Sequence, residues 1–221
     1  MKHIPGDATR AAALISGRII SELRAGKFVL WLVSGGSNVA IAVSALDLIK
    51  KSCRNHLSHL FVTLTDERFG PVGHTDSNWK QLGDKGFDFS CVQATPVLKG
   101  LDPQETARTF EENFKRMRGE VDIIIGQFGV GDDCHIAGVL PLSEAVSSKK
   151  FVVAYDTPKF LRVTLTLEAL KSIDVAYAFV FGESKNEALK KLKEGTSTLA
   201  LAPGLVLSGM KETYLVTDQV L

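Results

Sequence analysis

The chain has 221 residues, of which 45% are hydrophobic and 23% are charged, and these fractions are close to the averages for soluble globular proteins. The 26 basic and 25 acidic residues leave a net charge of +1, which excludes recruitment of nucleic acid or a membrane surface by a global electrostatic field. The apolar runs are too short to span a bilayer, which needs about 20 residues. The three cysteines have no CxxC spacing, which argues against a disulfide framework and against a thiolate zinc site. We therefore expect a cytoplasmic protein with no nucleic-acid or membrane partner.

Apolar periodicity predicts alternating helices and strands along most of the chain. The first helix pattern has Asp7 as its N-cap and Gly26 as its end, a later one has Pro103 in its first turn, and the last is closed by Gly195. Residues 162–171 begin extended and become helical. In chain order, the predicted elements besides residues 162–171 are helix 7–26, strand 27–33, helix 39–52, strand 60–65, helix 102–117, strand 121–128, strand 173–181, helix 184–195 and strand 213–218.

Strands separated by helices of this length favour one α/β domain over residues 1–221, with three layers, a mostly parallel sheet and helices on both faces, as in Rossmann-like folds. In open parallel sheets, ligands bind in the crevice beyond the carboxyl ends of the strands. This rule selects four loops that begin where predicted strands end: 34–38 (SGGSN), 66–78 (DERFGPVGHTDSN), 129–135 (GVGDDCH) and 182–187 (GESKNE).

The loop SGGSN joins a strand to a helix through two glycines. Ser37 or Asn38 is placed to cap the helix that follows. Backbone N–H groups at a helix N-terminus attract an anion, and glycine lets a phosphate come close. A tight turn without a ligand explains the same residues equally well. The loop is not a P-loop, because no Lys-Ser/Thr pair follows at the required spacing.

The loop GVGDDCH brings Asp133 within two residues of His135. A carboxylate beside an imidazole orients the ring, which is what a general base requires. The alternative is a solvated loop with an incidental histidine. The same stretch resembles a damaged dinucleotide fingerprint, but two aspartates would repel a pyrophosphate. Cys134 is predicted to be a small buried thiol, because side chains adjacent in sequence usually point apart and a Cys–His pair is normally assembled by the fold.

Three cations lie at strand ends or loop starts: Arg68, Arg162 and Lys185. Arginine suits bidentate contact with phosphate, and lysine offers a movable point charge. Any one of them would be a solvated surface residue by default. Together around one crevice, they would form a phosphate pocket.

The succession of SGGSN, TDERFGPVGHTDSN, GVGDDCHIAGVLP, RVTLT and GESKNEAL resembles the 6-phosphogluconolactonase family, which shares its fold with the glucosamine-6-phosphate isomerases. The resemblance implies a cytoplasmic hydrolase of the oxidative pentose phosphate pathway that works without a metal or cofactor. Its partner would be a sugar phosphate, 6-phospho-D-glucono-1,5-lactone, which it opens to 6-phosphogluconate as a monomer or homodimer.

The resemblance also implies the roles of individual residues. His135 would activate water, with Asp133 supporting it. Arg162 and Lys185 would hold the phosphate, and Arg68 would face the same pocket. The remaining expected substrate-binding residues are Ser34, Gly35, Gly36, Ser37 and Asp66.

The central motif departs from the lactonase pattern at four positions. Cys134 stands for a glycine, Ile136 for a threonine, Gly138 for a serine and Leu140 for a phenylalanine. A family glycine indicates a backbone shape that a side chain can spoil. Ile136 is closer to the isomerases, but residues 139–141 (VLP) lack the carboxylate that isomerases carry there. The alternatives are therefore an isomerase/deaminase-like enzyme and a non-catalytic sugar-phosphate-binding protein.

Overall fold

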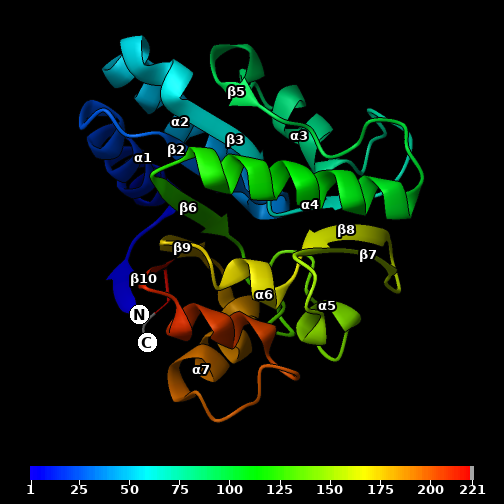
Figure 1. Cartoon of the computed structure of the whole chain (residues 1–221). Helices are drawn as coiled ribbons and strands as arrows, with labels where there is room; N and C mark the ends of the chain where they lie inside the picture. Colours follow the sequence, from blue (N-terminus) through cyan, green and yellow to red (C-terminus); the bar gives the residue numbers. More distant parts are fainter. Residues whose placement is uncertain (220–221) are drawn as a thin grey trace.

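The computed structural model describes residues 1–219 and contains two sheets (Figure 1). The larger sheet has seven strands, and every neighbouring pair in it is parallel. Its spatial order is β1 (Lys2–Pro5), β10 (Glu212–Thr217), β9 (Val175–Phe179), β6 (Ile123–Phe128), β2 (Val29–Val33), β3 (Leu60–Leu64) and β5 (Gln93–Ala94). The predicted α/β class with a mostly parallel sheet is confirmed.

The smaller sheet is antiparallel and consists of β4 (Asp66–Arg68), β8 (Leu161–Leu165) and β7 (Val152–Asp156), with β8 in the middle. It lies next to helix α4 (Pro103–Glu120), which crosses the front of the molecule in Figure 1. The pairing of β4 with β8 sets Arg68 directly opposite Arg162. The sequence predicted only a polar loop after Asp66, so this strand was missed.

Helices cover both faces of the large sheet. The strand order and the right-handed rule for parallel crossovers place the helices that precede β2 and β3 on one face, and those that follow β5 and β9 on the other. The first group packs α1 against α2, and α4 belongs to the second (Figure 1). The remaining helices are α1 (Ala8–Arg24), α2 (Val39–Cys53), α3 (Asn78–Asp84), α5 (Glu144–Ser147), α6 (Leu167–Leu170) and α7 (Asn186–Glu194), with short 3₁₀ turns at Gly36–Asn38, Arg54–His59, Phe89–Cys91, Glu183–Lys185 and Pro203–Gly209.

Most predicted helix ends are confirmed. The Asp7 side chain caps α1 by accepting a hydrogen bond from the Arg10 backbone N–H at 2.9 Å. Gly195 ends α7 in the left-handed region with φ of 63°. The predicted cap of α2 is wrong, because no side chain of the described residues caps this helix. A 3₁₀ turn over Gly36–Asn38 leads into α2 instead, and Asn38 is itself helical there.

The core lies between the large sheet and its helices, and all five residues of β2 are fully buried. No helix within residues 1–219 is long and apolar enough to cross a membrane. The single-domain assignment to residues 1–221 stays a prediction, and its last two residues lie outside the described part of the chain.

The chain reverses its direction across the sheet next to β2. From β2 it moves to β3 on one side, whereas β6 pairs with β2 on the other side. Parallel sheets form a crevice at such a switch point, beyond the carboxyl ends of the two strands. The loops that leave β2 and β6 there are SGGSN and GVGDDCH.

Candidate active site

A cleft of about 160 Å³ opens at this switch point. Nine of the ten residues predicted for the site line it, and the tenth, Asp133, contacts His135 from outside the lining. The lining comprises Ser34, Gly35, Gly36, Ser37, Asn38, Asp66, Arg68, Asn78, Gly129, Val130, Gly131, His135, Ala137, Arg162 and Lys185. All four loops selected from the sequence contribute to it.

The His135 ring is held by Asp133. The Nδ1 atom lies 2.6 Å from Asp133 Oδ1, and the same oxygen accepts the His135 backbone N–H at 3.0 Å. These hydrogen bonds, the one from the ring first, lower the pKa of Asp133 from 3.8 to about 2. An ionised carboxylate only accepts hydrogen bonds, so Nδ1 carries a proton, and in the neutral form of the ring the lone pair is then on Nε2. Within residues 1–219 this Nε2 has no hydrogen-bond partner, and it belongs to a ring that lines the cleft.

A tight turn carries this pair. The Cys134 N–H donates to the Gly131 carbonyl at 2.8 Å, and the Gly131 N–H donates to the His135 carbonyl at 3.0 Å. A Cβ at Gly131 would lie 2.1 Å from His135 Nδ1, so only glycine lets the ring lie against this turn.

Cys134 occupies the left-handed region with φ of 69°, the conformation that explains a glycine in the family pattern. Its side chain is fully buried, as predicted, and burial raises the pKa of its thiol. Its carbonyl accepts the Gly204 N–H at 2.8 Å. The turn therefore keeps the shape expected of glycine although the residue is a cysteine.

The SGGSN loop has structural reasons for its glycines. A Cβ at Gly35 would lie 1.8 Å from Asn78 Oδ1, and Gly36 has φ of 66°. Ser34 is buried, and its hydroxyl bonds the Gln127 carbonyl at 2.7 Å and the Thr65 hydroxyl at 2.9 Å. Ser34 therefore fixes the floor of the cleft, while Gly36 and Ser37 are exposed at its rim.

Arg68 and Arg162 form one wall of the cleft. Both guanidinium groups lie over the Phe160 ring, at 5.3 and 5.8 Å from its centroid. Arg162 Nη1 lies 2.9 Å from Asp66 Oδ2, and both side chains of this pair are largely buried. Arg68 Nη1 donates to the Asp76 carbonyl at 2.8 Å. In the described part of the chain, the buried Nε of each arginine has no acceptor.

Lys185, at the start of α7, is the third cation of the lining. Its Nζ lies 2.7 Å from Asp132 Oδ1. The two neighbouring aspartates of GVGDDCH therefore face different partners, because Asp133 holds the histidine and Asp132 holds the lysine. No role was predicted for Asp132 from the sequence.

Two asparagines of the lining were not predicted. Asn78 begins α3 and donates from Nδ2 to the Asp66 carbonyl at 2.9 Å. Asn38 is 1% exposed, and neither atom of its side-chain amide has a partner among the residues that the structure describes. Both could have been predicted from the sequence, because each is the last residue of a loop that was expected to form the site.

Glu67 anchors the DER segment (residues 66–68) to the start of α3. The fully buried Glu67 carboxylate accepts backbone N–H groups of Arg68, Asn78 and Trp79 and the Ser77 hydroxyl, at 2.6 to 3.1 Å. Burial raises the pKa of Glu67, and the four donors oppose that shift. This cluster fixes β4 to α3 and so positions Arg68.

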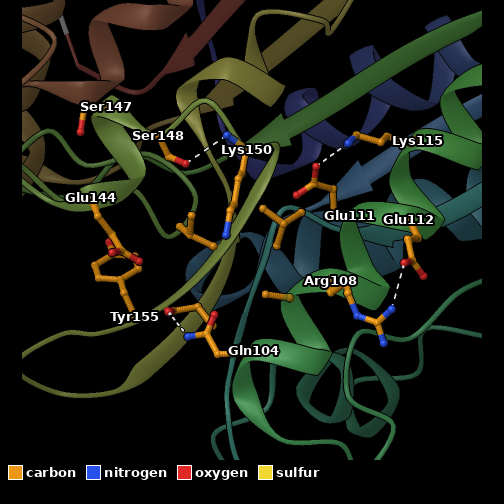
Figure 2. A pocket seen from close by; sticks show the side chains of 14 residues that line it. Gln104, Arg108, Glu111, Glu112, Lys115, Glu144, Ser147, Ser148, Lys150 and Tyr155 are labelled. Atoms are coloured by element: carbon orange, nitrogen blue, oxygen red, sulfur yellow. Dashed lines mark hydrogen bonds and ion pairs between the residues drawn. The ribbon is translucent and has the colours of Figure 1, made fainter.

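A larger groove of about 950 Å³ lies between α4 and β7 (Figure 2). Its charged side chains mostly neutralise one another, as in Glu111 with Lys115 at 2.5 Å and Arg108 with Glu112 at 3.4 Å. The described residues contain no group of three potential metal ligands, in this groove or elsewhere. The groove therefore offers less for catalysis than the cleft.

Tyr155 connects the groove to the active-site loop. Its hydroxyl donates to the Gly138 carbonyl at 2.5 Å and accepts the Leu140 N–H at 3.2 Å. The Gly138 N–H donates to the Thr164 hydroxyl at 3.0 Å. Hydroxyls from the small sheet thus hold the segment in which this chain lacks the family's serine and threonine.

Residues 7–214 match the sequence profile of the glucosamine-6-phosphate isomerases/6-phosphogluconolactonase family. The chain belongs to this family. A 6-phosphogluconolactonase of Helicobacter pylori strain J99 is 24% identical over 180 residues, which are 77% of this chain and 74% of the relative.

Solved structures of the family share the fold. A 6-phosphogluconolactonase from Thermotoga maritima superposes with a TM-score of 0.77 at 20% identity, covering 98% of each chain. One from Trypanosoma brucei gives a TM-score of 0.78 at 18% identity, covering 98% of this chain and 96% of that one. A monomeric glucosamine-6-phosphate deaminase gives 0.80 at 17% identity, covering 99% and 98%. At these identities the likeness establishes the fold, and the reaction must be argued from the site.

Proposed function

We propose that this protein is a cytoplasmic 6-phosphogluconolactonase that hydrolyses 6-phospho-D-glucono-1,5-lactone to 6-phosphogluconate in the oxidative pentose phosphate pathway. The observation that carries the proposal is the His135–Asp133 pair at 2.6 Å, which leaves Nε2 unpaired among the described residues of a cleft with three cations. The curated relative named 6-phosphogluconolactonase supports the same substrate.

In the proposed reaction, His135 Nε2 accepts a proton from a water molecule as its oxygen attacks the lactone carbonyl carbon. The resulting tetrahedral intermediate collapses by breaking the bond from that carbon to the ring oxygen. The imidazolium returns its proton to this leaving oxygen, which becomes a hydroxyl group. Asp133 keeps the proton on Nδ1 and stabilises the positive charge that the ring carries between the two steps.

We assign the substrate phosphate to Arg162, Arg68 and Lys185. All three side chains line the same cleft, so a phosphate bound there could contact the guanidinium groups and the ammonium group. Gly35, Gly36 and Ser37, which also line the cleft, would lie against the substrate. Asp66 and Ser34 would act indirectly, Asp66 by orienting Arg162 and Ser34 by fixing the loop.

An isomerase or deaminase reaction is less well supported. Residues 139–141 (VLP) supply no carboxylate for a second proton transfer. A sugar-phosphate-binding protein without catalysis would need a disabled histidine loop. The ordered turn around Cys134 and the short His135–Asp133 contact favour a competent one.

The test is to assay the purified protein with 6-phosphogluconolactone and, separately, with glucosamine 6-phosphate. We expect lactone hydrolysis well above the spontaneous rate and no deamination. Deamination without lactone hydrolysis would replace the proposal with the isomerase alternative. Tight binding of 6-phosphogluconate without either reaction would establish a non-catalytic binder.

A further inference from the structure

The Lys185–Asp132 ion pair lies at the cleft, where we expect the Lys185 ammonium group to contact the substrate phosphate. Lys185 lines the cleft with a side chain 24% exposed, whereas the side chain of Asp132 is 65% exposed. The pair joins two loops, the one after β6 and the one before α7. Neither loop is otherwise linked to the other by a side-chain hydrogen bond or ion pair within residues 1–219.

The other carboxylates of the site have fixed tasks. Asp66 is 4% exposed and bound to Arg162 and to the Thr65 hydroxyl, so it remains buried whatever the cleft contains. Asp133 accepts two hydrogen bonds from His135, one from the backbone N–H and one from the ring. Asp132 has no hydrogen-bond donor other than Lys185 in the described chain, and its exposure lets it turn into solvent at little cost.

We infer that Asp132 is an affinity-setting residue that competes with the substrate phosphate for Lys185. This inference rests on the proposed assignment of the phosphate to this cleft. When a phosphate dianion enters, Lys185 exchanges a single exposed carboxylate for a group of higher charge with three acceptor oxygens. The displaced Asp132 carboxylate then lies next to the phosphate and repels it, which opposes binding and favours release of the product.

The expected size of the effect follows from two contributions of the same sign. Freeing Lys185 removes an exposed ion pair, which corresponds to a factor of about 1.4 to 5 in binding. Removing the negative charge near the phosphate adds a further, salt-dependent gain. We therefore expect Asp132→Asn to bind phosphorylated ligands about two- to tenfold more tightly at moderate ionic strength.

The matched control is Asp84→Asn. Asp84 pairs with Lys80 at 2.7 Å and has a side chain 60% exposed, so both variants lose the same charge from a similarly exposed Lys–Asp pair of equal length. Asp84 ends α3 and does not line the cleft. A general effect of net charge on anion binding would appear in both variants, and competition for Lys185 only in the first.

The experiment is calorimetric titration of wild type, Asp132→Asn, Asp84→Asn, Lys185→Ala and the Asp132→Asn/Lys185→Ala double variant. The probes are inorganic phosphate, 6-phosphogluconate and unphosphorylated gluconate. We expect Asp132→Asn to tighten the first two by two- to tenfold and to leave gluconate unchanged. In the Lys185→Ala background the gain from Asp132→Asn should shrink markedly, because the competition acts through Lys185.

Unchanged or weaker phosphate binding in Asp132→Asn would overturn the inference and leave the proposed function intact, since it would mean that Asp132 positions Lys185 instead of competing for it. An equal gain in the Lys185→Ala background would also overturn it. Failure of wild type to bind either phosphorylated probe would overturn the phosphate assignment itself. Lactone turnover then decides the proposed reaction separately.

Discussion

Replacing Arg162 with alanine is expected to damage both substrate binding and the stability of the fold. Arg162 and Asp66 form an ion pair at 2.9 Å with side chains only 13% and 6% exposed. Alanine would leave the Asp66 carboxylate buried without its cation. Removing one partner of a buried pair destabilises a protein by about 3–5 kcal/mol. For a chain of this size that corresponds to a fall in Tm of about 6–20 °C.

The assay combines urea unfolding with steady-state hydrolysis of the phosphorylated lactone. We expect Arg162→Ala to raise KM at least about tenfold, because a charge-assisted contact to the phosphate is lost. Arg162→Lys keeps the charge and should recover part of the stability. Asp66→Asn in the Arg162→Ala background should also recover stability, because it removes the unpaired charge. A loss of stability below about 1 kcal/mol together with an unchanged KM would refute both the buried-pair argument and the phosphate assignment.

Three further substitutions test the histidine loop. Cys134→Gly should keep its turnover, since the backbone already has a glycine conformation; a tenfold loss would mean that the thiol itself is needed. Asp133→Asn should lower kcat at least about tenfold by misorienting His135, with KM little changed. Because His135 lowers the pKa of Asp133 from 3.8 to about 2, this carboxylate stabilises the fold above pH 3.8 and the benefit is lost as the pH falls toward 2. In wild type this loss amounts to about 1 kcal/mol of the free energy of unfolding, because the Asp133 side chain is half exposed. The Asp133→Asn variant should not show this loss between pH 4 and 2. Tyr155→Phe should lower kcat/KM severalfold by loosening the Gly138 segment, and unchanged kinetics would show that the hydroxyl is dispensable.

The sequence predicted the five central strands of the large sheet, β10, β9, β6, β2 and β3, because these strands have a strong apolar signal. Residues 27–33, 121–128 and 173–181 are mostly apolar, and each contains a buried parallel strand. The missed elements lack such a signal. β1 has only four residues and ends in proline, and α3 lies in a stretch dominated by polar and turn-forming residues. The small sheet depends on pairing between β4 and β8, nearly one hundred residues apart in the chain, which periodicity does not reveal.

The residues of the cleft were predictable because a parallel sheet brings the carboxyl ends of its strands to one edge. The partners of those residues were not predictable. Nothing in the sequence indicates that Asp132 faces Lys185 while Asp133 faces His135, because both contacts depend on the turn around Cys134. The predicted cap of α2 was wrong for a related reason. The 3₁₀ turn over Gly36–Asn38 continues directly into α2, so the residue at the capping position is already in a helical conformation.

The measurement that tests the account most directly compares wild type with His135→Ala in lactone hydrolysis, corrected for the spontaneous rate, with 6-phosphogluconate binding measured on both proteins. We predict that His135→Ala loses about 10²–10⁴ in kcat and still binds 6-phosphogluconate, because the histidine acts on the water and the cations hold the phosphate. Near-normal turnover in a folded His135→Ala variant would contradict the account and move the catalytic base elsewhere.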